Sequence, residues 1–403
     1  MLKQIHIVNY KSIEKAVVDL EPLTILVGPN GAGKSNIIDA IRFVADCLDV
    51  GPGQALRRRG GFAVVGHVPH HQHLENDEHG DVWGRHIGFR LTLQLPEEVS
   101  ADYSFELEWR GLDHFVVASE RCEVRGTSSA PAAFEARDGC FTRPVEGVRS
   151  QLKPDRLALS IVSAVEEFRA VYDFLSQMRH YTVEPDVMRA LQDPEPGTTL
   201  KDDGSNAASV LRRIEGSRGY ERMGGLLDLL LDDAPVEVHA MSIGPKETIE
   251  FIERGNGGQG RSLPAHSMSD GMLRFLGVLL AVYQKTPPSL IAVEEPESHV
   301  HPAAAEILFS ALEEGTMQSQ IVIATHSPEI LDLKSLKEDQ IRIVEMVSGK
   351  TIISAIGPQT KGIIRDRLFT AGELLSSNEL RREDGVLDSR EPELDIFKTE
   401  PAS

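Results

Sequence analysis

The sequence predicts an α/β protein in which a mainly parallel sheet is combined with an antiparallel β meander and a helical insertion. Three observations support this fold class. A glycine-rich loop stands between a short apolar strand and an amphipathic helix near the N-terminus. Residues 85–142 alternate between apolar and polar side chains, as an antiparallel meander does, and residues 155–231 have helical spacing. In the last third of the chain, short apolar strands alternate with helices, which is typical of a parallel sheet.

The first lobe is expected to span residues 1–150. It begins with three short strands, whose predicted ranges are 3–9, 14–19 and 23–27. The glycine-rich loop follows, and residues 36–48 then form an amphipathic helix with apolar side chains at helical spacing. The meander comes next, and Asp138–Gly139 supplies one of its hairpin turns.

The rest of the chain divides into three further parts. Residues 151–234 are expected to form the helical insertion, and residues 235–375 a second lobe with a parallel-sheet pattern. Residues 376–403 are rich in Glu and Asp and poor in large apolar side chains, so we expect a disordered acidic tail.

Composition and charge exclude several functional classes. The 403 residues are 41% hydrophobic and 26% charged, which is ordinary globular composition. A formal net charge of −20 disfavours a surface that coats nucleic acid broadly, so any contact with DNA or RNA must be local. The sequence shows neither an apolar stretch of about 20 residues nor a secretory leader, and we therefore expect a cytoplasmic protein without membrane contact.

The glycine-rich loop has the pattern of a phosphate-binding loop. Residues 28–35 read GPNGAGKS and fit G-x-x-x-x-G-K-[ST], directly after a strand and before a helix. In such a loop the backbone N–H groups face phosphate oxygens, Lys34 bridges the β- and γ-phosphates, and Ser35 ligates Mg²⁺. ATP and Mg²⁺ are therefore the expected cofactors. The residues expected to bind the nucleotide here are Gly28, Pro29, Asn30, Gly31, Ala32, Gly33, Lys34, Ser35 and Asn36.

Two later strands end in polar side chains suited to the same chemistry. The apolar run 290–293 is followed by Glu294, placed to hold the hydration shell of Mg²⁺, and by Glu295, placed to polarise the attacking water. The run 321–324 leads to His326, which can donate to the γ-phosphate or to that water. Ligands bind at the carboxyl ends of parallel strands, so these side chains are expected to share one site.

A fourth element opens the apolar helix predicted at residues 270–285. Ser269 has the position of an N-cap, and Asp270 and Gly271 begin the first turn. Such a cap leaves free N–H donors at the positive end of the helix, which favours an anion. The element lies about 20 residues ahead of the acidic strand.

The order of phosphate loop, serine-glycine cap, acidic strand and histidine strand resembles the ATP-binding-cassette (ABC) ATPases. More narrowly, it resembles the RecF/SMC-like branch, which includes the ATPase parts of overcoming-lysogenization-defect nucleases and of Septu antiphage systems. The segments that carry the resemblance are IVNYKSIE at 7–14, GPNGAGKSN at 28–36, LKDDGSNAASVL at 200–211, MSDGMLRFL at 268–276, EEPESHVHP at 294–302, ATHSPEIL at 324–331 and AGELL at 371–375. The implied fold is a P-loop NTPase, an ABC-ATPase head with two lobes.

The resemblance also implies roles for individual residues. Residues 28–35 correspond to Walker A, 269–271 to the signature motif and 296–301 to the D-loop. The catalytic residues would be Lys34, Glu295 and His326; the metal would be held by Ser35 and Glu294; and Ser269, Asp270 and Gly271 would bind the nucleotide. Glu294 stands where many ABC proteins have Asp, as is usual in this branch. Gln94 is the best candidate for the Q-loop.

The implied function is an ATPase that dimerises head to tail, with each ATP between the Walker A of one chain and the signature of the other. It would act as the ATPase or sensor subunit of a DNA-metabolism or phage-defence complex, with a nuclease or toxin subunit acting in trans, since only 77 residues follow His326. A structural clamp without turnover would be favoured only if Glu295 were absent. A RecF-like DNA-repair clamp is the main alternative. A transporter subunit is disfavoured by the 232 positions between Ser35 and Ser267.

Two clusters are ambiguous. Arg57–Arg59 could contact ATP across a dimer or a nucleic-acid backbone, or could form a solvated basic turn. A run of histidines resembles a metal site but lacks acidic or cysteine partners at defined spacing, so no metal is expected there. These histidines are His67, His70, His71, His73 and His79.

Overall fold

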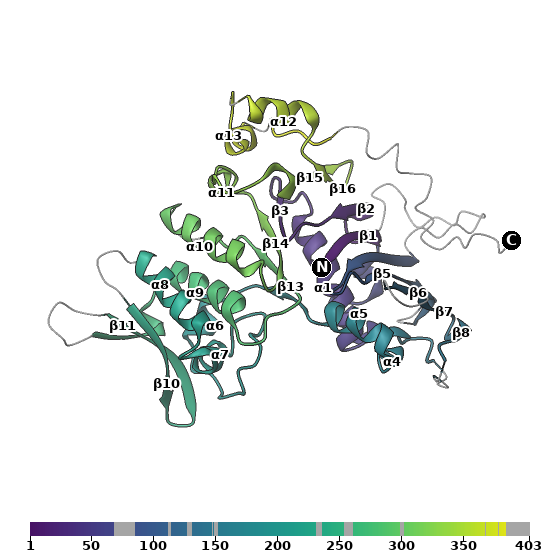
Figure 1. The fold of residues 1–403 in the computed structure, drawn as a ribbon, viewed down its shortest axis with the longest axis horizontal. Coiled ribbons are helices and arrows are strands. Elements are labelled where there is room, and N and C mark those ends of the chain that lie inside the picture. The colour runs from purple at the N-terminus through teal and green to yellow at the C-terminus, as the bar shows by residue number, and fades with distance from the viewer. Residues whose placement is uncertain are drawn as a thin grey trace.

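A computed structural model gives the fold of the chain (Figure 1). It describes residues 1–67, 85–111, 114–126, 131–146, 148, 152–230, 236–253, 261–298, 302–366, 368–377 and 379–383. The tail beyond residue 383, the last three residues of the predicted D-loop, and His70, His71, His73 and His79 lie outside this part. Within the described residues, no helix is both long enough and apolar enough to cross a membrane.

A six-stranded sheet forms the centre of the molecule, in the order β16-β15-β3-β14-β13-β9. Its strands are β3 (Leu23–Val27), β9 (Met178–Tyr181), β13 (Leu290–Glu294), β14 (Gln320–Thr325), β15 (Ile341–Val347) and β16 (Lys350–Ala355). All pairings are parallel except the hairpin of β15 and β16. Every residue of β3 and β14 is buried, as expected for parallel strands covered on both faces. The predicted α/β fold class is confirmed.

The strand β9 is a departure from the predicted pattern. It lies in the middle of the segment interpreted as a helical insertion, yet it pairs in parallel with β13 and forms the edge of the central sheet. Its four residues are too few to show a period of two, and helices precede and follow it. The segment 151–234 is therefore not helical throughout.

A seven-stranded antiparallel sheet contains the predicted meander, in the order β2-β1-β4-β5-β6-β7-β8. Its strands are β1 (Leu2–Tyr10), β2 (Ile13–Asp19), β4 (His86–Gln94), β5 (Ser100–Trp109), β6 (Phe115–Arg125), β7 (Ala132–Arg137) and β8 (Cys140–Arg143). The turn at Asp138–Gly139 joins β7 to β8, and both residues have positive φ, 45° and 76°. Helix α1 (Lys34–Asp49) packs between this sheet and one face of the central sheet.

Alternate residues of the central strands face two different cores. Leu26, Ala292 and Val322 face the core shared with α1 and the antiparallel sheet. Ile25, Val293 and Ile323 face the core of a helical lobe. That lobe contains α6 (Pro185–Arg189), α7 (Ala207–Ile214), α8 (Arg218–Leu230), α9 (Asp270–Tyr283), α10 (Pro302–Gly315) and a small sheet of β10 (Val236–Ile243), β11 (Lys246–Glu253) and β12 (Arg261–Pro264).

Short helices complete the two cores. They are α2 (Pro52–Arg57), α3 (Phe62–Val65), α4 (Leu159–Val162), α5 (Glu166–Ser176), α11 (Pro328–Leu331), α12 (Pro358–Arg365) and α13 (Ala371–Ser376). The chain remains packed beyond residue 376, where the acidic tail was predicted to begin. Leu380 is buried, and Arg382 forms a bridge with Ile356 and an ion pair with Glu345 at 3.0 Å.

A buried carboxylate ties the antiparallel sheet to the helices that follow it. Glu120, on β6, accepts hydrogen bonds from the backbone N–H groups of Ala158 and Leu159 and from the hydroxyl of Tyr103, at 3.0 Å. Burial raises the pKa of the Glu120 carboxyl to about 7, although these three hydrogen bonds oppose the shift. The folded protein therefore holds this proton more tightly than the unfolded chain.

The first prediction concerns Glu120→Gln. The stability that the Glu120 proton contributes is complete below the ordinary pKa of 4.5 and is lost as the pH rises through about 7. An amide cannot titrate, and its NH₂ would face an N–H donor. We therefore expect the variant to lose about 1 to 3 kcal/mol at pH 5 and less at pH 8. Urea unfolding across this range measures the difference. Glu123→Gln, on the same strand but partly exposed, is the control. If the free energy of unfolding changes equally with pH in wild type and Glu120→Gln, the prediction is contradicted.

Candidate nucleotide site

The phosphate loop leaves β3 and enters α1, and the hairpin of β15 and β16 lies directly against it. A Cβ atom on Gly28 would lie 2.0 Å from the carbonyl oxygen of Val344. Gly33 has a φ of 105°, and a Cβ atom there would lie 1.9 Å from Oγ1 of Thr351. Close packing therefore requires glycine at both positions. At Gly33 the backbone conformation requires it as well.

A chain of hydrogen bonds supports the loop from behind. The Asn36 amide donates to the Ser12 hydroxyl at 2.5 Å, and that hydroxyl lies 2.6 Å from the hydroxyl of Thr351. Thr351 in turn donates to the carbonyl oxygen of Ala32 at 3.1 Å. Ser12 and Thr351 were not predicted as site residues, because nothing in the local pattern shows that residues so distant in the chain meet.

The second prediction concerns Thr351→Val. The substitution keeps the side-chain volume but removes the donor to Ala32 and the partner of Ser12, so the loop loses its support. We expect ATP affinity, measured by titration calorimetry with Mg²⁺, to fall about threefold to tenfold while the protein stays folded. Thr360→Val, at another buried threonine, is the control. Unchanged ATP affinity in Thr351→Val would show that the loop holds its shape without this support.

Lys34 lies over the phosphate loop with its ammonium group facing the loop carbonyls. Its Nζ atom is 2.7 Å from the carbonyl oxygen of Gly28 and 3.1 Å from that of Pro29. Burial lowers the pKa of Lys34, while the charges of the nearby Glu295 and Glu294 act in the opposite direction. The cation therefore lies within the loop that the sequence predicts to hold phosphate groups.

Ser35 and Glu294 form the candidate metal pair. The Ser35 hydroxyl donates to Oε2 of Glu294, and Nε2 of His180 lies 3.3 Å from Oε1 of the same carboxylate. Burial would raise the pKa of Glu294, but the hydrogen bonds from His180 and Ser35 outweigh it, so the pKa lies below its usual range. A hydroxyl and an ionised carboxylate are oxygen ligands of the kind that Mg²⁺ uses beside phosphates, so the donor set fits this ion.

Glu295 and His326 make direct contact. Nδ1 of His326 lies 2.9 Å from Oε1 of Glu295, and the Ser298 hydroxyl donates to Oε2 at 3.0 Å. The Glu295 backbone has a φ of 45° and is held there by its N–H bond to the carbonyl of Ala324 at 2.8 Å. A left-handed conformation in a glutamate is strained, and such strain is concentrated at functional sites. Both side chains are well exposed, so they are accessible to a bound ligand.

Glu297 is a further acidic residue at this edge of the sheet, to which the sequence analysis gave no individual role. Its carboxylate accepts a hydrogen bond from the Thr325 hydroxyl at the end of β14. Burial raises the pKa of Glu297. The contact fastens the start of the predicted D-loop to the strand that carries His326.

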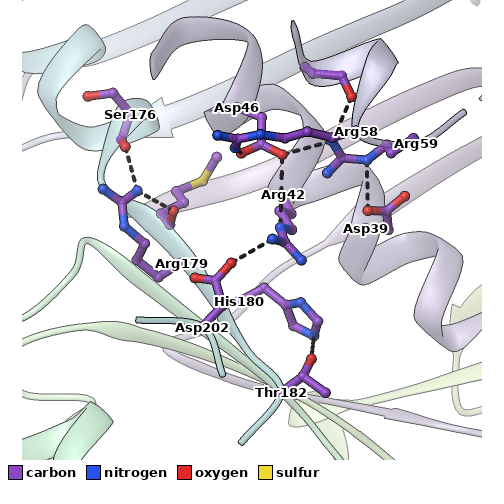
Figure 2. Close-up of polar contacts among 12 residues, drawn as sticks. Asp39, Arg42, Asp46, Arg58, Arg59, Ser176, Arg179, His180, Thr182 and Asp202 are labelled. Atoms are coloured by element: carbon purple, nitrogen blue, oxygen red, sulfur yellow. Dashed lines mark hydrogen bonds and ion pairs between the residues drawn. The ribbon is translucent and has the colours of Figure 1, made fainter. Parts of the chain in front are cut away.

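The structure does not place Gln94, the predicted Q-loop residue, with this site. Gln94 ends β4 and is exposed, and its side chain donates to the carbonyl of Val99 at 3.3 Å. His180 instead approaches Glu294, and Figure 2 shows it beside Thr182 at the end of β9. Because β9 has no strand signal in the sequence, His180 could not be predicted as a site residue.

The basic cluster Arg57–Arg59 is largely neutralised by α1 (Figure 2). Arg59 is nearly buried and forms ion pairs with Asp39 at 2.9 Å and with Asp46 at 2.7 Å. Arg58 pairs with Asp46 at 3.3 Å, whereas Arg57 contacts an amide oxygen of its own helix. Two of the three guanidinium groups therefore serve the packing of this turn onto α1.

His67 is also structural. It is buried, and its Nδ1 lies 2.7 Å from the carbonyl oxygen of Lys11. Over the part of the chain that the structure covers, no group of three or more His, Cys, Asp or Glu side chains is arranged to hold a metal ion.

The predicted signature residues lie in the helical lobe at the start of α9, and Figure 1 shows α9 away from α1. The Ser269 side chain caps the helix by accepting the N–H of Met272 at 3.2 Å. The structure therefore brings together Lys34, Ser35, Glu294, Glu295 and His326, and it holds Ser269, Asp270 and Gly271 on a different lobe.

Comparison with known proteins finds ATPase families. Residues 1–50 match the family described as "AAA ATPase domain", and residues 167–332 match "AAA domain, putative AbiEii toxin, Type IV TA system". The DNA replication and repair protein RecF of Porphyromonas gingivalis is 36% identical over 99 residues, which are 24% of this chain and 24% of RecF. The OLD nuclease of Thermus scotoductus is 48% identical over 44 residues, 11% of this chain and 8% of the nuclease. These matched stretches span a quarter or less of the relatives.

Among solved structures, an Smc head bound to the C-terminal winged-helix domain of ScpA has the same fold. Its TM-score is 0.54 at 12% identity, over 90% of this chain and 99% of that one. Together with the fold, these matches support an ABC-type ATPase that is similar to the RecF/SMC-like branch.

Proposed function

We propose that this chain binds and hydrolyses ATP with Mg²⁺ as a head-to-tail dimer, and that it is the ATPase or sensor subunit of a DNA-metabolism or phage-defence complex. The observation that carries the proposal is the contact of Glu295 with His326 at the end of neighbouring strands, beside the Ser35 and Glu294 pair. This is a base and its orienting partner next to two oxygen ligands for a metal.

Each group has a defined task in this mechanism. The loop amides and Lys34 would hold the β- and γ-phosphates, and Ser35 and Glu294 would hold the metal. Bound Mg²⁺ would neutralise part of the charge on the phosphates. Glu295 accepts a hydrogen bond from the attacking water and orients it toward the γ-phosphorus, while His326 keeps the Glu295 carboxylate in place.

The division of the site between two lobes supports the dimer. The phosphate loop and the catalytic pair lie at the edge of the central sheet, whereas the N-terminus of α9 lies in the helical lobe. A second copy in head-to-tail orientation would place its α9 N-terminus on the γ-phosphate, which has the negative charge that such a terminus attracts. Two composite sites would then close one symmetric dimer.

We also propose that any nuclease or toxin activity comes from a partner protein. The site residues identified here all serve nucleotide chemistry. The Smc head of similar fold is bound to a domain of ScpA, which is one example of a head of this shape with a protein partner.

A RecF-like clamp that binds DNA directly is the second candidate, and the similarity to RecF favours it. Against it, Arg58 and Arg59 are engaged with Asp46 and Asp39, so the cluster offers little free positive charge to a phosphate backbone.

The third prediction concerns the link between ATP and association. Glu295→Gln should still bind ATP and Mg²⁺ but cannot orient water, so an ATP-dependent dimer should accumulate. Ser269→Arg in the same background should prevent that dimer by crowding the γ-phosphate of the facing chain. Light scattering with and without ATP measures the mass. Lys34→Ala, which lacks the phosphate cation, is the control that should remain monomeric. A Glu295→Gln protein with no increase in mass beyond wild type would refute the dimer.

The fourth prediction concerns activity in trans. The purified protein with ATP and Mg²⁺ should hydrolyse ATP slowly and leave plasmid DNA intact. Agarose gels and phosphate release measure the two activities. Plasmid cleavage that survives purification and is lost in Lys34→Ala or Glu295→Gln would show that the chain itself cuts DNA.

A further inference from the structure

His180 is a buried histidine of β9 that lies on the α1 side of the central sheet. It pairs in register with Ala292 of β13, and Ala292 faces the core shared with α1. Glu294 lies two residues further along β13 and therefore on the same face. Ser35, in the first turn of α1, approaches Glu294 from the helix. The imidazole is only 8% exposed, so it lies beneath the candidate metal pair of Ser35 and Glu294.

The surroundings of the ring determine which nitrogen of His180 carries the proton. Nδ1 is buried and has no hydrogen-bond partner among the described residues, so a proton there would be a buried donor without an acceptor. Nε2 lies 3.3 Å from Oε1 of Glu294 and 3.5 Å from the hydroxyl of Thr182. A carboxylate can only accept, and it is the nearer and the charged acceptor of the two. The Nε2–H group of His180 therefore donates to Glu294.

The two oxygens of the Glu294 carboxylate have different partners. Oε1 accepts from His180, and Oε2 accepts from the hydroxyl of Ser35. Contacts at both oxygens fix the rotation of the carboxylate plane. They direct Oε2 toward the hydroxyl beside which a metal ion would be held.

The residues on either side of His180 hold β9 in place. Tyr181 faces the core of the helical lobe, and its hydroxyl accepts a hydrogen bond from Gln284 at 3.0 Å. The Arg179 guanidinium donates to the backbone carbonyl of Ser176 at 2.8 Å (Figure 2). Parallel pairing with β13 fixes the strand itself. The imidazole of His180 is therefore carried by a rigid element, as a group that orients another side chain must be.

We propose that His180 is a positioning residue for the candidate metal ligand Glu294. Its Nε2–H group holds Oε1, so that Oε2 stays on the Ser35 side, where the Mg²⁺ that accompanies ATP would be held. This inference rests on the proposed function with ATP and Mg²⁺. A residue that orients a metal ligand contributes to metal affinity without touching the metal, and its loss costs about tenfold to a hundredfold in that affinity.

The experiment uses the full chain with Ser269→Arg, which should not form the proposed dimer, so that nucleotide binding to a single copy is measured. Titration calorimetry with AMP-PNP, a nonhydrolysable ATP analogue, is done once with Mg²⁺ and once with EDTA. The ratio of the two affinities is the gain from the metal. His180→Leu, which removes the donor to Glu294, should reduce this gain on the order of tenfold. The affinity in EDTA should not change, because Lys34 and the loop amides remain in place.

Rescue by a conservative variant distinguishes positioning from packing. His180→Gln places an amide N–H where Nε2–H was, and it should restore most of the gain from Mg²⁺. A purely structural role of the imidazole predicts that Gln and Leu lose the gain equally. Tyr181→Phe removes a hydroxyl from the opposite face of β9, and as the matched control it should keep the full gain. If thermal melting shows that His180→Leu is unfolded, His180→Asn replaces it, because its shorter amide does not reach Glu294.

Glu294→Gln separates this inference from the proposed function, since it removes the charge of the candidate metal ligand and should lose the gain from Mg²⁺. If Mg²⁺ gives no gain in the parent chain, or if Glu294→Gln keeps it, the proposed metal site itself fails. A gain that Glu294→Gln loses but His180→Leu keeps would overturn the inference alone. A loss in His180→Leu that His180→Gln does not restore would overturn it as well.

Discussion

The candidate site depends on one constraint: the parallel strands of the central sheet all end at the same edge. The strand register pairs Thr325 with Val27 and Glu294 with Ala324. The residues that follow β3, β13 and β14 therefore lie next to one another at the same edge of the sheet. The phosphate loop, the acidic pair and His326 are thereby brought together without any direct sequence proximity. Val293 pairs with Tyr181 on the other side, which brings His180 to Glu294. Parallel pairing alone thus assembles groups from four distant segments.

Burial on both faces keeps that edge rigid. One face packs on α1 and the antiparallel sheet, and the other on the helical lobe, so each central strand contributes alternate residues to two cores. Helix α1 is held on its outer side by polar contacts as well: Asp39 accepts from Arg59 and Tyr10 and pairs with Lys11. The loop that precedes α1 therefore runs from a fixed strand to a fixed helix. A loop held at both ends in this way is preorganised, as phosphate binding requires.

The two halves of the proposed composite site are joined along the chain by the segment from β9 to α6. His180, in β9, touches the candidate metal ligand Glu294, and Arg189, nine residues later, touches the start of α9. Thr182, between them, donates its backbone N–H to Asp202 at 2.8 Å, and Asp202 pairs with Arg42 of α1 (Figure 2). The same short segment therefore connects the sheet edge that carries the candidate site, helix α1 and helix α9.

The sequence by itself determined the groups whose chemistry depends on local pattern. Local pattern predicts the phosphate loop, the acid pair after an apolar strand, His326 and the cap at Ser269. Each of these lies at a strand end, a turn or a helix start, and neighbouring residues specify such positions. The alternation of the meander was equally clear.

Tertiary structure decided the rest. The strand β9 has only four residues and shows no period, so His180 could not be found. The predicted Q-loop residue Gln94 lies at the end of β4, where its side chain contacts Val99. Thr351 supports a loop more than 300 positions away, and Arg189 holds Asp270 across 81 positions. Such contacts arise from the packing of whole elements, and no local pattern of side chains encodes them.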